Sequence, residues 1–372
     1  MAEADLPDTA PPHDELERLF SVYEVRIQDG QFRYYGEPLA SKRQILETLW
    51  PVFRERGYEL SLSTELGEQV LIAEPRQTES SGLPWINILL AVATVGTTLF
   101  AGAQWYHISF ASSPLNIIDA WPFAAAIMGV LGIHELGHYA MSRYYDVDAT
   151  LPYFIPVPTF IGTLGAVIRM RGQMPSRKAL FDIGVAGPLA GLVATVAVSV
   201  IGLLLPPITV PEHAATAANA MEIRLGYPPL LQSIAWALGQ QLHYADPTKA
   251  VNPVVIGGWV GMFVTFLNLL PVGQLDGGHI LRAVLGDSHE AVAKAVPFAL
   301  FGLAGYLLVT RGGGNAVGLW AFWGLFTLVF VKAGAASPIL ERELGTGRKI
   351  LAVVTFLLGA LAFTPVPIQI VS

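Results

Sequence analysis

The chain has 372 residues, of which 53% are hydrophobic and 14% are charged, and its formal net charge is −7. These values are typical of polytopic membrane proteins rather than soluble enzymes, and no basic block points to nucleic acid as a partner. The sequence contains no cysteine, so disulfides and thiolate metal ligands are excluded. Any bound metal ion must therefore be held by other side chains, such as His, Asp or Glu.

The amino-terminal part predicts a lead-in followed by a small soluble domain. Residues 1–20 form the lead-in, which starts acidic and Pro-rich, resembles neither a signal nor a transit peptide, and is expected to be disordered. Residues 21–80 contain alternating, strand-like stretches around a helical stretch that Ser41 is expected to cap. The expected order is β-β-α-β-β, which gives a small α+β domain in the cytosol.

Residues 84–372 predict an integral-membrane domain. Six to seven transmembrane helices are expected, because the last apolar stretch is short and its crossing of the membrane is left open. Residues 151–180 carry Pro and Gly between strand-like runs, which predicts a short membrane-associated β-hairpin that lines a cavity. An amphipathic helix is expected at residues 227–238. The candidate spans are residues 84–102, 117–140, 183–205, 251–270, 291–309, 316–331 and 350–363.

The distribution of Lys and Arg predicts the orientation of these spans. With the amino terminus in the cytosol, only Arg224, Lys249 and Arg311 fall on the opposite side, and every other basic residue is cytosolic. The spans at 117–140 and 251–270 then both run from outside to inside. Their carboxyl-terminal ends are expected at the same depth, near the cytosolic face.

The first of these two spans contains the motif His134-Glu135-Leu136-Gly137-His138. On a helix, two histidines four residues apart lie on one face, about 6 Å apart along the axis. That spacing suits one zinc ion, with Glu135 beside a metal-bound water. The alternative is a helix whose polar residues only contact a neighbouring helix. Ionisable residues inside a membrane span are costly and usually functional, which favours the metal site.

The second span ends in Asn268-Leu-Leu-Pro-Val-Gly-Gln-Leu-Asp-Gly-Gly-His279. A catalytic zinc takes three protein ligands and leaves one position open, so Asp276 is the expected third ligand. Pro271 is expected to break the helix, and the two glycines after Asp276 to let the backbone turn around the metal. The alternative is a Gly-Asp loop that merely ends a helix. His279 is expected beside the ligands rather than as a fourth ligand.

The two motifs together resemble the site-2 protease family of intramembrane zinc metalloproteases. Residues 162–166 and 187–191 resemble further core segments of that family. The resemblance implies one Zn²⁺ per chain, ligated by His134, His138 and Asp276, with Glu135 as general base. It also implies that Asn268 orients or stabilises the reacting carbonyl group.

The same resemblance implies a zinc metalloendopeptidase whose partners are the lipid bilayer and transmembrane protein substrates. The zinc-activated water would cleave peptide bonds within or near the spans of these substrates. A strand containing Gly162, Thr163, Leu164 and Gly165 is expected to pair with an unwound substrate segment, although a purely structural hairpin is equally compatible with the sequence.

Two other functions stay open on the sequence alone. One is a catalytically idle membrane scaffold or chaperone of the same fold, and the other is a metal transporter, for which no internal repeat is found. The small amino-terminal domain and the short outer loop without a PDZ insert are similar to the branch with plant chloroplast and related prokaryotic members. A prokaryotic inner membrane is the expected location, with a plastid membrane as the alternative. The substrate, the cleavage position, the activating signal, the role of the amino-terminal domain and the oligomeric state are left open.

Overall fold

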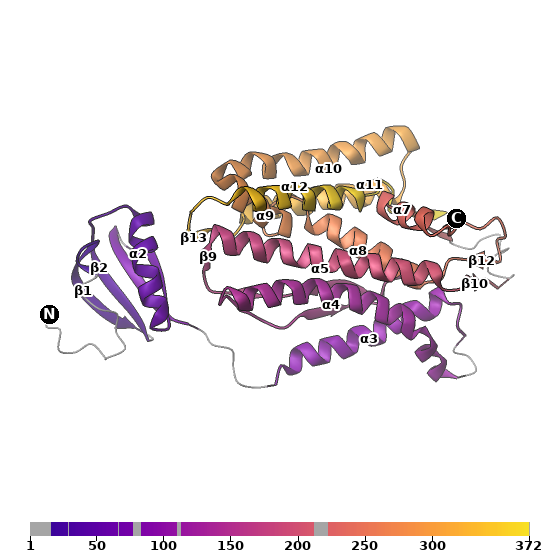
Figure 1. Ribbon diagram of the computed structural model, residues 1–372, viewed down its shortest axis with the longest axis horizontal. Helices are drawn as coiled ribbons and strands as arrows, with labels where there is room; N and C mark the ends of the chain where they lie inside the picture. Colours follow the sequence, from indigo (N-terminus) through magenta and orange to yellow (C-terminus); the bar gives the residue numbers. More distant parts are fainter. Residues whose placement is uncertain are drawn as a thin grey trace.

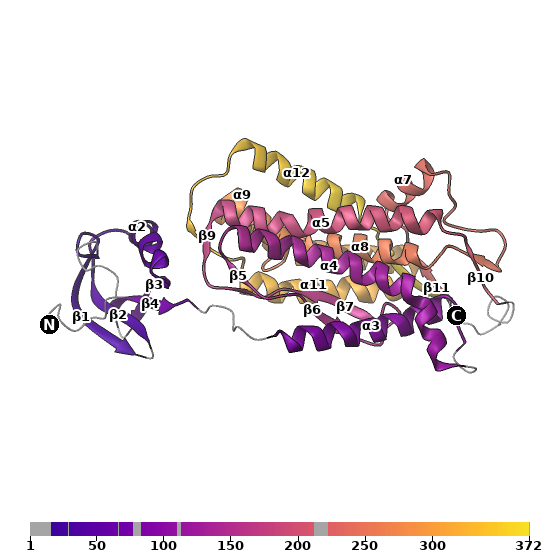
Figure 2. The same ribbon diagram turned by 60° about the horizontal axis from the view of Figure 1, so that its bottom comes forward.

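The computed structural model describes residues 16–28, 30–65, 67–76, 83–109, 113–211 and 222–371 (Figure 1). Most of the expected lead-in and most of the linker after the amino-terminal domain therefore lie outside the described residues. Within the described part, a small mixed unit lies at one end of a bundle of long helices, as Figures 1 and 2 show from two directions.

The amino-terminal unit is a four-stranded antiparallel sheet with one helix packed on it. Its elements are β1 (Phe20–Gln28), β2 (Gln31–Pro38), α2 (Lys42–Glu55), β3 (Tyr58–Glu65) and β4 (Glu68–Pro75). The strands lie in the order β1-β2-β4-β3, which confirms the predicted β-β-α-β-β succession. Ser41 caps α2, because its Oγ accepts a hydrogen bond from the Gln44 N–H at 3.3 Å. Ile45, Leu49 and Phe53, at helical spacing on α2, form the core of this unit with side chains of the sheet.

Each of the seven apolar stretches forms a helix. In the described part of the chain, five helices are long and apolar enough to cross a membrane. The other two are shorter, with 15 residues in one and 16 in the other, so helix length alone supports fewer spans than the six to seven predicted. The seven helices are α3 (Trp85–Trp105), α4 (Trp121–Tyr144), α5 (Arg177–Leu204), α8 (Val254–Asn268), α10 (His289–Arg311), α11 (Asn315–Ala333) and α12 (Thr346–Leu361).

The short helix α8 lies in the interior of the bundle. Eleven of its residues are buried, and it packs against both α4 and α5. Most of its surface is therefore covered by neighbouring helices. The indole of Trp259 on α8 is fully buried and donates a hydrogen bond to the Gly226 carbonyl at 2.8 Å.

The short helix labelled α7 (Pro229–Ala237) lies at the end of the bundle that is far from the amino-terminal unit (Figure 1). It is the predicted amphipathic helix, which packs Leu231 into the central core and leaves Trp236 85% exposed. The remaining elements are short: the helices η2 (Pro114–Ala120), α9 (Asp276–Leu285) and η3 (Gly286–Ser288), and the strands β5 (Asp148–Ala149), β6 (Tyr153–Pro156), β7 (Thr163–Val167), β8 (Met170–Arg171), β9 (Met174–Ser176), β10 (Ile208–Thr209), β11 (Glu222–Leu225), β12 (Lys249–Ala250), β13 (Pro338–Leu340) and β14 (Ile368–Val371).

The predicted hairpin is confirmed as the antiparallel pair β6–β7. β6 packs along α3, and β7 contacts α3 and α4. Side chains of α3 bind the hairpin backbone: the Trp105 Nε1–H donates to the Phe160 carbonyl at 2.7 Å, and the Thr97 hydroxyl donates to the Gly162 carbonyl at 2.6 Å. These bonds satisfy carbonyl groups of an irregular segment at the depth of the helices, as a membrane interior requires.

Candidate metal centre

His134, Glu135 and His138 lie on α4 and are all buried. The helix forms because its sequence from Trp121 to Ile133 is apolar and uncharged, and because all its backbone polar groups can bond within the helix. The spacing of four residues places both imidazole rings on the same face, with their centroids 5.0 Å apart.

Asp276 reaches the same place from the turn that joins α8 and α9. The chain turns after Asn268, and α9 begins at Asp276 itself. The prediction that Gly277 and Gly278 form a turn around the metal is therefore wrong, because both lie in the first turn of α9. A Cβ atom on Gly277 would lie 2.2 Å from the Leu269 carbonyl oxygen, and one on Gly278 would lie 2.3 Å from the Gly273 carbonyl oxygen. Gly277 lets the start of α9 pack on the end of α8, and Gly278 lets it pack on the loop between the two helices.

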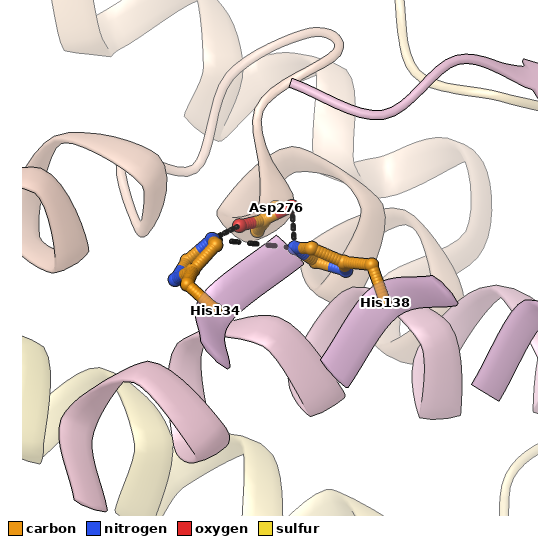
Figure 3. Close-up of side chains that lie close together, drawn as sticks. All are labelled: His134, His138 and Asp276. Atoms are coloured by element: carbon orange, nitrogen blue, oxygen red, sulfur yellow. Dashed lines mark hydrogen bonds and ion pairs between the residues drawn. The ribbon is translucent and has the colours of Figure 1, made fainter. Parts of the chain in front are cut away.

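The three side chains converge on one point between the helices (Figure 3). The Nε2 atoms of His134 and His138 are 3.3 Å apart. Asp276 places Oδ2 3.3 Å from His134 Nε2 and Oδ1 3.2 Å from His138 Nε2. Tetrahedral zinc with ligand bonds of about 2.0–2.1 Å separates its ligand atoms by about 3.3 Å. The donor set and its spacing therefore fit one zinc ion, and this is the one such His, Asp or Glu cluster among the described residues.

Helix α5 forms the opposite wall of this centre and fixes the protonation of one ring. His138 Nδ1 lies 2.8 Å from the carbonyl oxygen of Ile183, which can only accept a hydrogen bond. The proton must therefore sit on Nδ1, which leaves the lone pair of Nε2 directed at the other two donors. A backbone carbonyl in this position is a common partner of a metal-binding histidine.

Two glycines of α5 make room for the imidazole rings. A Cβ atom on Gly187 would lie 2.0 Å from His138 Nε2, and one on Gly191 would lie 2.8 Å from His134 Nδ1. The glycines and the histidines share a spacing of four residues, so the two helices are matched in register at the centre. The shared spacing is visible in the sequence, but the pairing of these glycines with the histidines depends on how α4 and α5 pack.

Glu135 and Asn268 lie beside the cluster rather than in it. The Glu135 carboxylate lies close to the backbone of Ile168, just beyond the end of β7. The Asn268 amide nitrogen is 3.2 Å from His134 Nε2. A carboxylate and an amide therefore flank the point where the three donors meet, which suits a base and a hydrogen-bond donor. The contact with Ile168 was not expected from the sequence.

His279 is buried about one turn along α9 from Asp276. Among the described residues it does not belong to the metal-binding cluster, which contains two histidines and one aspartate. A Cβ atom on Gly184 of α5 would contact His279 Cβ at 3.3 Å, so the ring occupies the contact between α9 and α5.

Residues Gly162 to Gly165, expected to bind substrate, form the turn into β7 and its first part. Gly162 has a φ of 87°, and a Cβ atom there would lie 2.5 Å from the Thr97 carbonyl oxygen, so this glycine is needed where the hairpin meets α3. β7 pairs with β6 in a two-stranded sheet, and within the described residues its other edge carries no strand. The Leu164 side chain is 69% exposed.

Comparison with known proteins adds family-level information to this geometry. The family model described as peptidase family M50 matches residues 122–308, which include both motifs. No solved structure matches the chain.

Three plant relatives illustrate the similarity at the level of whole chains. The "Probable zinc metalloprotease EGY1, chloroplastic" of Arabidopsis thaliana is 34% identical over 66% of this chain and 43% of its own length. The "Probable zinc metalloprotease EGY2, chloroplastic" of Oryza sativa subsp. japonica is 27% identical over 89% of this chain and 60% of its own length. The "Probable zinc metallopeptidase EGY3, chloroplastic" of Arabidopsis thaliana is 28% identical over 74% of this chain and 49% of its own length. The chain thus spans about half the length of the curated relatives it matches.

Proposed function

This chain belongs to peptidase family M50, and from that premise we propose that it is an intramembrane zinc metalloendopeptidase. It hydrolyses peptide bonds within or near the transmembrane segments of other membrane proteins. His134, His138 and Asp276 hold the zinc ion, Glu135 is the general base, and Asn268 binds the reacting carbonyl group.

One observation carries this proposal. Two spans that are more than a hundred residues apart in the sequence bring two imidazole nitrogens and a carboxylate within 3.3 Å of one another in the membrane region. Burying an unpaired carboxylate there is costly, so a cation at this point explains why all three side chains are present.

The chain's own residues supply the remaining parts of the mechanism. When bound, the zinc ion supplies a Lewis acid that activates water near neutral pH. Glu135 accepts the proton of the attacking water and delivers it to the leaving amine nitrogen. The Asn268 amide donates a hydrogen bond to the carbonyl oxygen as negative charge develops on it. The Ile183 carbonyl keeps His138 in the tautomer that leaves Nε2 free.

The activity can be tested with a single-span reporter helix that carries Gly-Pro in its middle, reconstituted with the protein in phospholipid vesicles. The wild type is expected to cleave the reporter, chelation to stop cleavage, and added zinc to restore it. Glu135→Gln should lower the cleavage rate by about 10²–10⁴-fold while the zinc content is unchanged. A Glu135→Gln variant that cleaves at the wild-type rate would rule out the proposed base.

We extend the proposal to the path of the substrate. A helical substrate must unwind before its peptide bond can be attacked, and the unpaired edge of β7, starting at Gly162, Thr163, Leu164 and Gly165, offers main-chain partners for the unwound segment. A photocrosslinker at Leu164 should label the reporter in the Glu135→Gln variant, whereas a crosslinker at the exposed Phe322 on α11 should not. Equal labelling from both positions would argue against strand pairing.

We also propose the orientation of the chain and its division into domains. A lead-in (residues 1–20) and an α+β domain (residues 21–80) precede the metalloprotease domain (residues 84–372), and the active site opens on the side of the α+β domain. That side is the cytosol of a prokaryotic cell, with a plastid membrane as the alternative location. Because the chain lacks cysteine, single cysteines at Glu47 and Asp246 report their sides cleanly to an impermeant thiol reagent. Labelling of both residues from the same side would contradict this topology.

A further inference from the structure

The amino-terminal unit contacts the loop that follows the metal-site helix, and the family match at residues 122–308 does not include this unit. Arg76, just after β4, donates from Nη1 to Asp146 Oδ2 at 2.8 Å and from Nη2 to the Asp146 carbonyl at 3.0 Å. It also lies 3.4 Å from Asp148 Oδ2. Arg54 of α2 donates to the same Asp146 carbonyl. The guanidinium groups of Arg54 and Arg76 therefore bind the loop that follows α4.

Glu59 and Trp50 of the amino-terminal unit restrict the conformations of Arg54 and Arg76. Arg54 Nη1 lies 3.1 Å from Glu59 Oε1, and Arg76 Nε lies 3.8 Å from the same oxygen. The Trp50 indole donates to Glu59 Oε2 at 3.2 Å, and the Arg54 guanidinium lies 4.5 Å above the Trp50 ring. Because these contacts already restrict both arginines, little side-chain entropy is lost when they bind Asp146.

The loop that the arginines hold is hydrogen-bonded to the segment that follows β7. Asp146 has a φ of 55°, an uncommon conformation for a residue other than glycine. Asp148 lies in β5, which pairs with β8. Thr150 and Arg169 extend this pairing through two hydrogen bonds of 3.0 Å each. The residue before Arg169 is Ile168, which directly follows β7, and β7 contacts α4, the helix that carries Glu135.

A second, apolar contact joins the same two parts of the chain. Ile339 of β13 packs against the core of the amino-terminal unit. β13 pairs with β9, which runs straight into α5, the helix whose Ile183 carbonyl binds His138. A cavity of about 330 Å³ lies beside the arginine contact, because Arg76 and Asp148 line it together with residues of both parts such as Ser61 and Gln173. The amino-terminal unit therefore touches both segments that lead to the metal centre.

We propose that Arg54 and Arg76 are positioning residues for the hydrolytic site. Through Asp146 and Asp148 they hold the end of the strand β7, which packs against α4, the helix that carries Glu135. The amino-terminal unit thereby acts as a docked control domain, which sets the rate of the chemical step without taking part in metal binding. This inference rests on the proposed protease function. It predicts that undocking lowers kcat and leaves the zinc ion in place.

The test uses the full chain with Arg54→Ala and Arg76→Ala combined, reconstituted with the Gly-Pro reporter. Hydrogen exchange is expected to speed up at residues 146–150 and 168–171, while zinc content stays at the wild-type value. The value of kcat should fall at least about tenfold with KM little changed, since a small displacement of a catalytic group has effects of this order. Arg43→Ala is the matched control, because Arg43 forms an exposed pair with Glu47 on the same helix.

Reversal of the charges separates positioning from misfolding. Arg76→Asp alone should lose activity, and Arg76→Asp combined with Asp146→Arg should recover most of the lost kcat. Wild-type exchange rates and wild-type kcat in the double alanine variant would overturn the inference, as would loss of zinc from that variant. If the wild type itself fails to cleave the reporter, the proposed function is wrong, and the exchange measurement still decides whether the arginine pair holds the strand end.

Discussion

His138 shows how single backbone atoms set the chemistry of the metal centre. Its Nδ1–H donates a hydrogen bond to the Ile183 carbonyl at 2.8 Å. Its Nε2 occupies space that a side chain at position 187 would fill, so the ring position requires Gly187. The ring is thus fixed from both sides by α5, a helix that contributes no donor atom to the three-residue cluster. Metal affinity therefore depends on residues that never touch the metal.

Gly187→Ala should weaken zinc binding. The added Cβ would lie 2.0 Å from His138 Nε2, so the ring or the helix must move away from the other donors. We expect the zinc affinity to fall by about 10–100-fold, as changes around metal ligands commonly do. Titration with a competing chelator would measure this loss.

Gly129→Ala is the matched control, because it lies on the metal-site helix α4 with no atom within 4 Å of its added Cβ. The zinc affinity of the Gly129→Ala variant should equal that of the wild type. Equal affinities for Gly187→Ala and Gly129→Ala would show that the contact between α4 and α5 does not shape the centre.

For single residues, the sequence predicted which side chains form the metal centre, but not which backbone groups contact them. The spacing of His134 and His138 is a local helical relation, and Asp276 was placed with them from the orientation of two spans. The Ile183 carbonyl and the backbone of Ile168 carry no signature in residue type, because every non-proline residue has the same backbone groups. Which of them faces a histidine or a glutamate depends on how helices pack, and periodicity does not encode that packing.

Helix α9 is the element that positions Asp276, and it is held at both ends. Its first turn packs on the end of α8 through Gly277 and on the loop between α8 and α9 through Gly278. At its other end, the buried Arg177 donates from Nε to the Ala283 carbonyl at 2.9 Å and from Nη2 to the Val284 carbonyl at 3.0 Å. These bonds satisfy carbonyl groups of the last turn and place positive charge there.

Arg177→Ala should destabilise the folded protein. The two carbonyl groups at the end of α9 lose charged donors, and hydrogen bonds of this kind contribute about 1.5–3 kcal/mol. Unfolding by denaturant in detergent would measure the change in the free energy of unfolding. Lys178→Ala, at the exposed neighbouring position, should stay close to the wild type. A change no larger than that of Lys178→Ala would argue that the end of α9 needs no cap.

Long, apolar helices were predicted correctly from the sequence, whereas the short helix α9 was not. All seven apolar stretches are helices, because a long uncharged run in a membrane can satisfy its backbone only as a helix or a closed barrel. Helix α9 was not predicted from the sequence, because Gly277 and Gly278 at its start have low helix propensity and are typical of turns. Contacts with Leu269 and Gly273, which no local pattern reveals, override that propensity.

On the scale of the whole molecule, charge at the surface joins the two parts of the chain. The hydrogen bond from Arg76 and its positive charge lower the pKa of Asp146 below its usual value of 3.8. The carboxyl group of Asp146 therefore favours the docked state when it is ionised. Burial raises the pKa of Glu59, while Arg54 and Arg76 act in the opposite direction and the charge of Asp148 adds to the rise.

These shifts predict how docking depends on pH. The ionised Asp146 carboxylate stabilises the docked state. This stabilisation is fully present above the usual pKa of the carboxyl group and is lost as the pH falls through its lowered pKa in the docked state. Glu59 takes up a proton at a higher pH than Asp146 does, and the hydrogen bonds from Arg54 and Arg76 to Asp146 do not require an ionised Glu59. Docking should therefore persist from neutral pH to about pH 4 and be lost only in stronger acid. Hydrogen exchange at residues 146–150 as a function of pH measures this transition, and Asp146→Asn should remove it. A transition near pH 6 would contradict the assignment to Asp146.

The most direct test of the central claim is the zinc content of the purified full-length protein in detergent, with wild type and Asp276→Ala measured side by side. It requires no substrate, and it asks whether residues of two separate spans form one centre. We expect about one zinc ion per chain in the wild type and little in the variant, because a catalytic zinc needs all three protein ligands. Zinc that is absent from the folded wild type, or that is retained in full by Asp276→Ala, would contradict the three-ligand centre and with it the proposed hydrolytic mechanism.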